Sequence, residues 1–233
     1  MDFSNLIQTV AIYALPVIFA ITLHEAAHGY VARYFGDNTA WMLGRVTLNP
    51  MKHIDPVGTI AMPLLLYIAT AGSFLFGYAK PVPVSFGNLR NPKRDMIWVA
   101  LAGPVVNLVQ AVFWTMLGAL LLNTGMGERF FLLMCRAGIL ANLAMFAFNM
   151  VPLPPLDGGR VLVGLLPRNA AMSFSRVERY GILIVAALLI LPSVTENKFP
   201  SVISTYWMLP IMRTTVELIG VPFPSVATLL TLR

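Results

Sequence analysis

The sequence predicts an all-α polytopic membrane protein with about five to six membrane segments, one of them re-entrant, and short β-strands at the membrane edge. Two observations predict this class. Of the 233 residues, 58% are hydrophobic and only 11% are charged, and the mean hydropathy is +0.75, well above that of a soluble domain of this size. Several uncharged runs also approach the roughly 20 residues that a helix needs to cross a bilayer. Cytosolic enzymes, disordered tails and disulfide scaffolds are therefore excluded.

The candidate membrane segments are apolar runs that contain no charged side chain: 3–23, 56–79, 96–123, 137–156, 180–195 and 199–212. The helix of the first run is expected to continue through HEAAHGYVARYFG and to stop at Gly36. The last two runs are shorter and carry a weaker signal. Because no polar block is long enough for a separate soluble domain, we expect a single membrane domain over 1–233, with its core at 5–165 and C-terminal helices at 178–220.

Two polar stretches lie between these runs, residues 39–56 and the sequence KPVPVSFGNLRNPK from Lys80. Both combine β-favouring valine and threonine with turn-favouring glycine, asparagine and proline. Prolines exclude central positions in a sheet but permit edge strands. We therefore expect short strands or extended loops at the membrane edge.

Charge and cysteine content limit the kinds of partner. The formal net charge is +6, but the basic residues stand singly between apolar runs, which favours cytoplasmic membrane flanks over a nucleic-acid surface. The expected surroundings are the lipid bilayer and no nucleic acid. The single Cys135 excludes an internal disulfide and a cysteine-based metal site. The oligomeric state does not follow from the sequence.

The first run leads into His24-Glu25-Ala26-Ala27-His28, an H-E-x-x-H pattern. Histidines at i and i+4 lie on the same helical face and reach one divalent ion, and Glu25 beside them is placed to take a proton from metal-bound water. Buried, unpaired ionisable groups at the end of an apolar helix are costly, which favours a functional cluster. The alternative is a solvated helix end just outside the bilayer.

A hydrolytic zinc site needs a third protein ligand and one open position. Asp157 is the best candidate, because the prolines and glycines of FNMVPLPPLDGGR prevent a regular helix and let a carboxylate approach a metal. A salt bridge between Asp157 and Arg160 is the alternative. His53, in the polar loop, is more simply a surface or loop-bracing residue, and Cys135 a packing residue.

The motifs HEAAHGY and NMVPLPPLDGG together resemble the site-2 protease family of intramembrane zinc metalloproteases, whose signatures are H-E-x-x-H and N-x-x-P-x-P-x-L-D-G on two membrane segments. The stretches GRVTLNPMKHIDPVGTIAMP, FGYAKPVPVSFGNLRNPKRD and ALAGPVVN are similar to the compact prokaryotic branch, which has no PDZ or CBS domain. The resemblance covers roughly residues 10 to 165. No motif is identified beyond it.

The resemblance implies a function and a site. It implies a zinc endopeptidase that cuts membrane proteins within or near their transmembrane segments, as in regulated intramembrane proteolysis. One zinc ion per chain would be bound by His24, His28 and Asp157, with Glu25 as the catalytic general base and Asn149 near the substrate groove. A metal transporter and an inactive relative are the alternative functions. A transporter, however, gains nothing from a spare glutamate or an open fourth position.

A shared zinc ion forces the ends of runs 3–23 and 137–156 to one depth, so run 56–79 must start and finish on the same side. It is then re-entrant rather than a simple span. Lysine and arginine support this topology, because the active-site side collects Arg33, Arg45, Lys52, Lys80, Arg90, Lys93, Arg94, Arg160, Arg168, Arg176 and Arg179, and the other side only Arg129 and Lys198. The positive-inside rule then predicts a multi-pass protein of the cell membrane with its active site nearer the cytoplasm.

The sequence also suggests where a substrate docks and what Asn107 and Asn149 contact. The strand-like segments 41–49 and 81–86 are suited to receive an unwound substrate by β-addition. Asn107 is expected mainly to hydrogen-bond between helices, and Gly103 to permit close helix packing. For Asn149, beside the bent motif, substrate contact is favoured.

Overall fold

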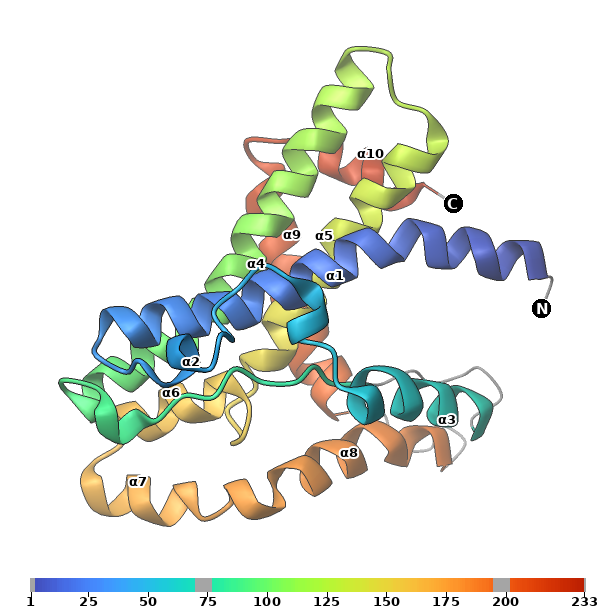
Figure 1. Ribbon diagram of the computed structural model, residues 1–233. Helices are drawn as coiled ribbons and strands as arrows, with labels where there is room; N and C mark the ends of the chain where they lie inside the picture. The colour runs from blue at the N-terminus through green and yellow to red at the C-terminus, as the bar shows by residue number, and fades with distance from the viewer. Residues whose placement is uncertain (1–2, 70–76, 195–201, 233) are drawn as a thin grey trace.

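The computed structural model of the protein describes residues 3–69, 77–194 and 202–232, and in these ranges all regular secondary structure is helical (Figure 1). Three helices are long and apolar enough to cross a membrane. They are α1 (Phe3–Tyr34) through its stretch Ile7–Tyr34, α4 (Pro92–Asn123) and α5 (Arg129–Asn149). The predicted all-α membrane class is confirmed, and the described part of the chain offers fewer spanning helices than the sequence predicted.

Helix α1 crosses the middle of the molecule and packs against both α4 and α5 (Figure 1). It has no charged residue before Glu25, as a helix in lipid requires. The helix ends at Tyr34, and the chain reverses at Gly36, whose φ of 111° is a left-handed conformation that glycine adopts without strain. The predicted stop at Gly36 is therefore correct.

Helices α4 and α5 form an antiparallel hairpin (Figure 1). Helix α4 begins at Pro92, and the buried Asp95 closes its first turn by accepting the main-chain N–H of Asn91 at 2.7 Å. Helix α5 begins at Arg129, eight residues before the start of the uncharged run 137–156, because Arg129 and Arg136 lie within the helix. It ends at Asn149, so the rest of that run is not helical.

The largest apolar core lies between the hairpin and the C-terminal helices. It is built from Trp114 on α4, Ile139 and Leu143 on α5, and Leu229 on α10 (Ser225–Thr231). Ile139, Leu143 and Leu229 are fully buried, and Trp114 is 4% exposed. This core fixes α4 against α5, and α4 in turn carries residues that contact α1.

The remaining C-terminal elements are helices α6 (Asp157–Leu165), α7 (Arg168–Ser175), α8 (Glu178–Val194), η4 (Ser204–Met208) and α9 (Leu209–Gly220). In Figure 1, α7 and α8 run along the side of the molecule opposite the α4–α5 hairpin. The predicted run 180–195 corresponds to α8 apart from its last residue. Part of run 199–212 lies outside the described residues, and the rest belongs to η4 and the start of α9.

Run 56–79 begins with the π-helix η2 (Pro56–Ala61) and continues as α3 (Met62–Ala69); residues 70–76 lie outside the described chain. The two described ends of the run lie side by side. The main-chain N–H of Tyr78 donates to the carbonyl of Gly58 at 2.9 Å, and the hydroxyl of Thr59 donates to the carbonyl of Tyr78 at 2.9 Å. The chain thus leaves this region close to where it entered.

The predicted membrane-edge strands are wrong for the described residues. The two stretches instead hold irregular loops and short helices: α2 (Thr39–Met42), η1 (Pro50–Lys52) and η3 (Phe86–Asn88). Pro81 and Pro83 have no N–H for a ladder. The guanidinium of Arg45 donates to the carbonyls of Lys80 at 3.0 Å and Pro81 at 3.3 Å.

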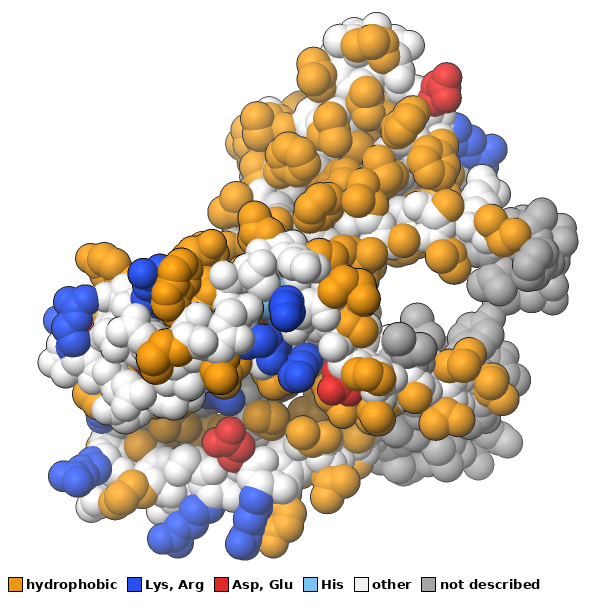
Figure 2. Space-filling view, viewed as in Figure 1, with side chains coloured by type: hydrophobic (Ala, Val, Ile, Leu, Met, Phe, Trp, Pro, Cys, Tyr) orange, Lys and Arg blue, Asp and Glu red, His pale blue; other side chains and the backbone are white. Residues whose placement is uncertain are grey.

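The surface separates into an apolar and a basic part. Figure 2 shows hydrophobic side chains over the α4–α5 hairpin, and most of the lysine and arginine side chains of this face in the half that holds α2 and α7. On α4, Val109, Phe113 and Leu120 are 62%, 57% and 57% exposed. Exposed apolar side chains of this density suit a helix surrounded by lipid.

Candidate metal centre

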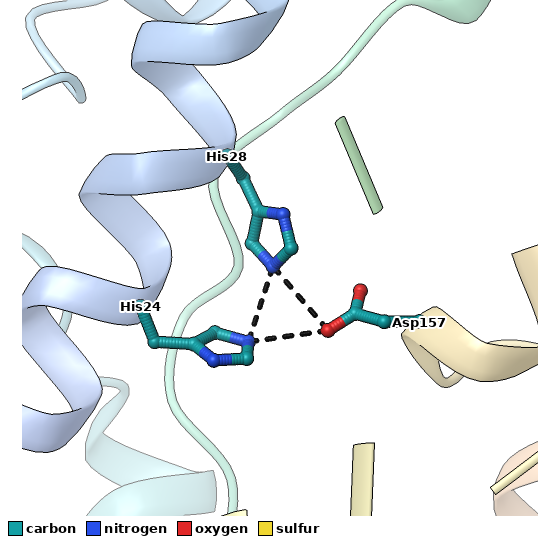
Figure 3. Close-up of side chains that lie close together, drawn as sticks. All are labelled: His24, His28 and Asp157. Atoms are coloured by element: carbon teal, nitrogen blue, oxygen red, sulfur yellow. Dashed lines mark hydrogen bonds and ion pairs between the residues drawn. The ribbon is translucent and has the colours of Figure 1, made fainter. Parts of the chain in front are cut away.

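Three buried side chains from two helices converge at one point (Figure 3). His24 and His28 lie one turn apart on α1, and Asp157 is the first residue of α6. The Nε2 atoms of the two histidines are 3.1 Å apart. The Oδ2 atom of Asp157 lies 3.3 Å from Nε2 of His24 and 3.4 Å from Nε2 of His28. The sequence prediction of these three residues as neighbours agrees with this geometry.

The turn between α5 and α6 brings Asp157 to α1. A side chain at Gly158 would collide with the carbonyl of Met150, and one at Gly159 with the main chain of Leu153 and Pro154. The two glycines therefore let the first turn of α6 fold back onto the proline-rich segment. This close return places the Asp157 carboxylate against the histidines.

The other ring nitrogen of each histidine is hydrogen-bonded, which fixes the tautomer. Nδ1 of His28 donates to the main-chain carbonyl of Val99 at 2.7 Å, and a carbonyl only accepts. Nδ1 of His24 donates at 2.6 Å to Oδ1 of Asn107. The amide nitrogen of Asn107 is itself a donor to Oδ1 of Asn142 at 2.9 Å, which assigns the orientation of the Asn107 amide. Both Nε2 atoms therefore present lone pairs to the centre.

This donor set fits a zinc ion. Two lone pairs 3.1 Å apart repel each other, and Oδ2 of Asp157 is buried without a hydrogen-bond donor. A cation among the three atoms removes both costs. Zinc–ligand bonds of about 2.0–2.1 Å in tetrahedral geometry require ligand atoms roughly 3.3 Å apart. The separations of 3.1 to 3.4 Å match this requirement, and three ligands leave a fourth position for water.

Helix α4 packs directly against the rings of His24 and His28. A β-carbon at Gly103 would lie 2.5 Å from Nε2 of His28 and 2.6 Å from Cε1 of His24. No real β-carbon approaches so closely, so only glycine fits beneath the two rings. The predicted packing role of Gly103 is correct, and the side chains that it contacts are the histidines themselves.

Glu25 follows His24 on α1 but lies outside the three-residue cluster. Its side chain is half-buried, and its Oε2 atom accepts the main-chain N–H of Val82 at 2.8 Å. The second carboxylate oxygen has no hydrogen bond within the described residues. Glu25 is thus held beside the centre without occupying it.

The alternative ligands lie elsewhere. His53 is buried, its Nε2 donates to the carbonyl of Thr47 at 2.9 Å, and its own carbonyl accepts the N–H of Lys80 at 2.9 Å, so it braces the loop as the sequence favoured. Cys135 is buried in the apolar core. Arg160, within the described chain, pairs with Glu178 at 3.6 Å and not with Asp157.

Asn149 is the last residue of α5 and is half-buried. Its amide nitrogen donates to the carbonyl of Met145 one turn earlier at 3.0 Å. It is not part of the three-residue cluster. It stands directly before the proline-rich segment, and its contact with substrate stays a prediction.

Sequence reasoning missed three supporting groups. They are the carbonyl of Val99, the contact of Asn107 with His24, and the N–H of Val82. Asn107 was expected to bond another helix, and it does so through Asn142. The spacing of Gly103 and Asn107, one helical turn apart, was the available signal that both face the same neighbour.

Comparisons with known proteins agree with this centre. The chain is 38% identical over 187 residues to "Putative zinc metalloprotease YwhC" of Bacillus subtilis, covering 76% of this chain and 80% of that protein. It is 31% identical over 198 residues to "Putative zinc metalloprotease Rip2" of Mycolicibacterium smegmatis, covering 82% of this chain and 70% of that protein. The Rip2 protein of Mycobacterium tuberculosis is 28% identical over 199 residues, with the same coverage. No family model and no solved structure matches the chain.

Proposed function

Because the chain belongs to the site-2 protease family of zinc metalloproteases, we propose that it is a membrane zinc endopeptidase that hydrolyses peptide bonds within or near transmembrane segments of other membrane proteins. The observation that carries the proposal is the convergence of two histidine lone pairs and an unpartnered carboxylate oxygen at one buried point. The expected stoichiometry is one zinc ion per chain, held by His24, His28 and Asp157.

A zinc ion held by His24, His28 and Asp157 would supply Lewis-acid chemistry, lowering the pKa of a bound water towards about 7 and polarising a peptide carbonyl. Glu25 acts as the general base. Its free carboxylate oxygen accepts the proton of the attacking water, and it then delivers that proton to the leaving amine. His24 and His28 keep their Nδ1 protons throughout, because Asn107 and Val99 hold them. This fixes the orientation of both rings while charge develops on the substrate.

The Glu25→Gln substitution tests the proposal. The amide cannot accept a proton, so hydrolysis of a membrane substrate is expected to fall by at least about 100-fold. Zinc content should not change, because Glu25 lies outside the ligand cluster. Full hydrolysis by zinc-loaded Glu25→Gln protein would overturn the assignment. Comparison of membrane proteomes with wild type and this variant would reveal the substrate as a fragment that only wild type produces.

A metal transporter, the main alternative, makes different predictions for the same variant. Zinc flux into proteoliposomes would continue in Glu25→Gln protein, because the ligands remain. If the chain is an inactive relative, the wild-type protein would bind zinc but cleave no substrate. The proposed protease function requires that wild type cleaves substrate and does not transport zinc. Measurements of cleavage and of zinc flux therefore separate the three functions.

The docking of substrate is proposed to use residues 46–48. The N–H groups of Val46, Thr47 and Leu48 have no hydrogen-bond acceptor among the described residues, whereas those of Val82 and Ser85 are already taken. An unwound substrate needs such main-chain donors in place of water. A proline at Leu48 should therefore raise KM for a membrane substrate and leave zinc content intact; unchanged KM and kcat would end this idea.

Asn149 is proposed to contact the substrate main chain. Its amide oxygen has no donor within the described residues, and the residue stands where α5 gives way to the proline-rich segment. The Asn149→Ala substitution is expected to raise KM several-fold at unchanged zinc content. An unchanged KM would assign Asn149 to helix capping alone.

The segment 56–79 is proposed to be re-entrant, with the active site nearer the cytoplasm and the protein in the cell membrane. The hydrogen bonds between Tyr78 and residues 58–59 support this topology, since they bring both ends of the segment together. Cysteine labelling tests it, because the native Cys135 is buried. In intact cells an impermeant maleimide should label Glu128→Cys but not Lys52→Cys; the reverse pattern would invert the topology.

A further inference from the structure

We propose that residues 80–85, called here the clamp segment, position the general base through one main-chain group: the N–H of Val82 holds one oxygen of Glu25 and leaves the other for the attacking water. The inference rests on the proposed role of Glu25. Val82 is a positioning residue in this sense, because it acts through Glu25.

The contact itself is direct. The N–H of Val82 donates to Oε2 of Glu25 at 2.8 Å, across 57 positions of the sequence. A hydrogen bond to a carboxylate is charge-assisted and stronger than one between neutral groups. With one oxygen bonded, the carboxylate loses its freedom to rotate about its last bond. Its second oxygen therefore keeps one direction.

The clamp segment is rigid by composition. Val82 lies between Pro81 and Pro83, whose rings fix their own φ angles. The residue before a proline is itself restricted to extended conformations, and this applies to Lys80 and to Val82. Since neither proline has an N–H, Val82 is the residue of the sequence PVP that can donate. The composition thus singles out one donor and holds it in place.

Both ends of the clamp segment are anchored. At its start, the N–H of Lys80 donates to the carbonyl of His53 at 2.9 Å, and the carbonyl of Lys80 accepts from Arg45 at 3.0 Å. At its end, the N–H of Ser85 donates to the buried carboxylate of Asp37 at 2.7 Å. These bonds fix the segment along α1 on both sides of Val82.

The side chain of Val82 sets its distance from α1. It is 6% exposed and packs with Val46 and Ala40. Gly29 lies one helical turn after Glu25, and a β-carbon there would be 3.2 Å from Cγ1 of Val82 and 2.7 Å from Cγ2 of Val46. The glycine therefore opens the space in which the Val82 N–H reaches Glu25.

The experiment removes this single N–H from the full-length protein in detergent. In the Val82→Pro variant the segment keeps its extended character, and the matched control Val82→Ala keeps the N–H and loses packing only. A second probe replaces the valine at 82 by its α-hydroxy acid, which converts the amide to an ester without the N–H; the same exchange at Val84 is its control.

We expect Val82→Pro and the ester at position 82 to lower kcat by about 10- to 100-fold, with KM within about twofold of wild type. Zinc stoichiometry should remain that of wild type. The affinity for acetohydroxamate, a zinc-binding group that shares a proton with the general base, should fall in parallel. The ester at position 84 should retain at least about half of the wild-type kcat, and Val82→Ala, which keeps the N–H, should lose less kcat than Val82→Pro.

Wild-type kcat and acetohydroxamate affinity in the ester-82 protein would overturn the inference, whatever the proline variant does. The inference would also be overturned if Val82→Pro lost zinc while the protein with the ester at position 82 kept the wild-type kcat. In that case the loss of packing would explain the whole effect. Failure of the proposed function looks different. In that case wild type itself would not cleave, or the Glu25→Gln variant would.

Discussion

His24 on α1 donates its Nδ1 proton to the side-chain oxygen of Asn107 on α4 at 2.6 Å, and both side chains are buried between the two helices. Asn107 is fully buried and extends the contact, since its amide donates to Asn142 on α5 and Asn142 donates to the carbonyl of Gly138 at 2.9 Å. One hydrogen-bonded chain therefore connects a proposed metal ligand with two further helices. Such outer contacts set the orientation and basicity of a ligating imidazole.

The Asn107→Ala substitution should weaken zinc binding by about 10- to 100-fold, because the His24 ring loses its acceptor and its fixed tautomer. Zinc affinity measured by chelator competition in detergent checks this. Asn142→Ala, which removes the next bond of the chain but leaves the His24 contact, serves as the control and should have the smaller effect. Equal zinc affinity of wild type and Asn107→Ala would contradict this role.

The Gly103→Ala substitution should reduce zinc affinity by more than about 10-fold, because its methyl group would displace both imidazoles. Gly118→Ala on the same helix is the matched control. There the methyl group would lie 2.5 Å from Cδ1 of Leu229, the flexible end of a side chain far from the ligands. The control should change the thermal midpoint and not zinc affinity. The idea fails if the two variants bind zinc alike.

The Asp157→Asn substitution should remove most bound zinc from purified protein, because the charge that balances the cation and the anionic ligand atom are lost. Arg160→Ala should keep it, since Arg160 pairs with Glu178 and lies 5.1 Å from the centroid of the Phe86 ring. Metal analysis after dialysis measures both. Retention of zinc by Asp157→Asn together with loss by Arg160→Ala would reverse the assignment.

Asp37, just beyond the end of α1, should make stability depend on pH. Burial raises the pKa of its carboxyl, but hydrogen bonds from Thr39, Ser85 and Asn88 outweigh burial and hold this pKa below its usual range. A depressed pKa means that the stabilisation is complete above the unfolded pKa of about 4 and is lost as the pH falls through the folded pKa.

The thermal midpoint of Asp37→Asn should accordingly lie below that of wild type at pH 7, and the difference should shrink below about pH 4. The amide offers N–H groups where Ser85 needs an acceptor, which is the reason for the loss at neutral pH. Differential scanning fluorimetry in detergent at several pH values measures the difference. A gap that widens on acidification would contradict the proposed state of Asp37.

The ligand cluster could be predicted from the sequence because it depends on local rules. The spacing of His24 and His28 fixes their common face on any helix, and Asp157 is an isolated carboxylate after an apolar run. The contacts around the cluster depend on long-range packing. Nothing in the neighbourhood of Val99 or Val82 indicates that their main-chain groups contact α1.

The fold shows the same division. The three long helices were predicted because lipid demands long apolar runs. The prediction of membrane-edge strands was wrong because side chains bind the main-chain groups that a strand would use for pairing. The Arg45 guanidinium donates to the carbonyls of Lys80 and Pro81, and Glu25 accepts the N–H of Val82. Composition reports propensity, whereas side chains from distant positions decide which main-chain groups are free to pair.

The proposed ligands His24, His28 and Asp157 have a consequence for biosynthesis. Helix α1 emerges from the ribosome long before α6, so the nascent chain inserts with its two histidines while their carboxylate partner has yet to be translated. Zinc binding by the proposed ligands would then be a late step of maturation that joins α1 to α6. A nascent chain halted before α6 should enter the membrane and remain metal-free.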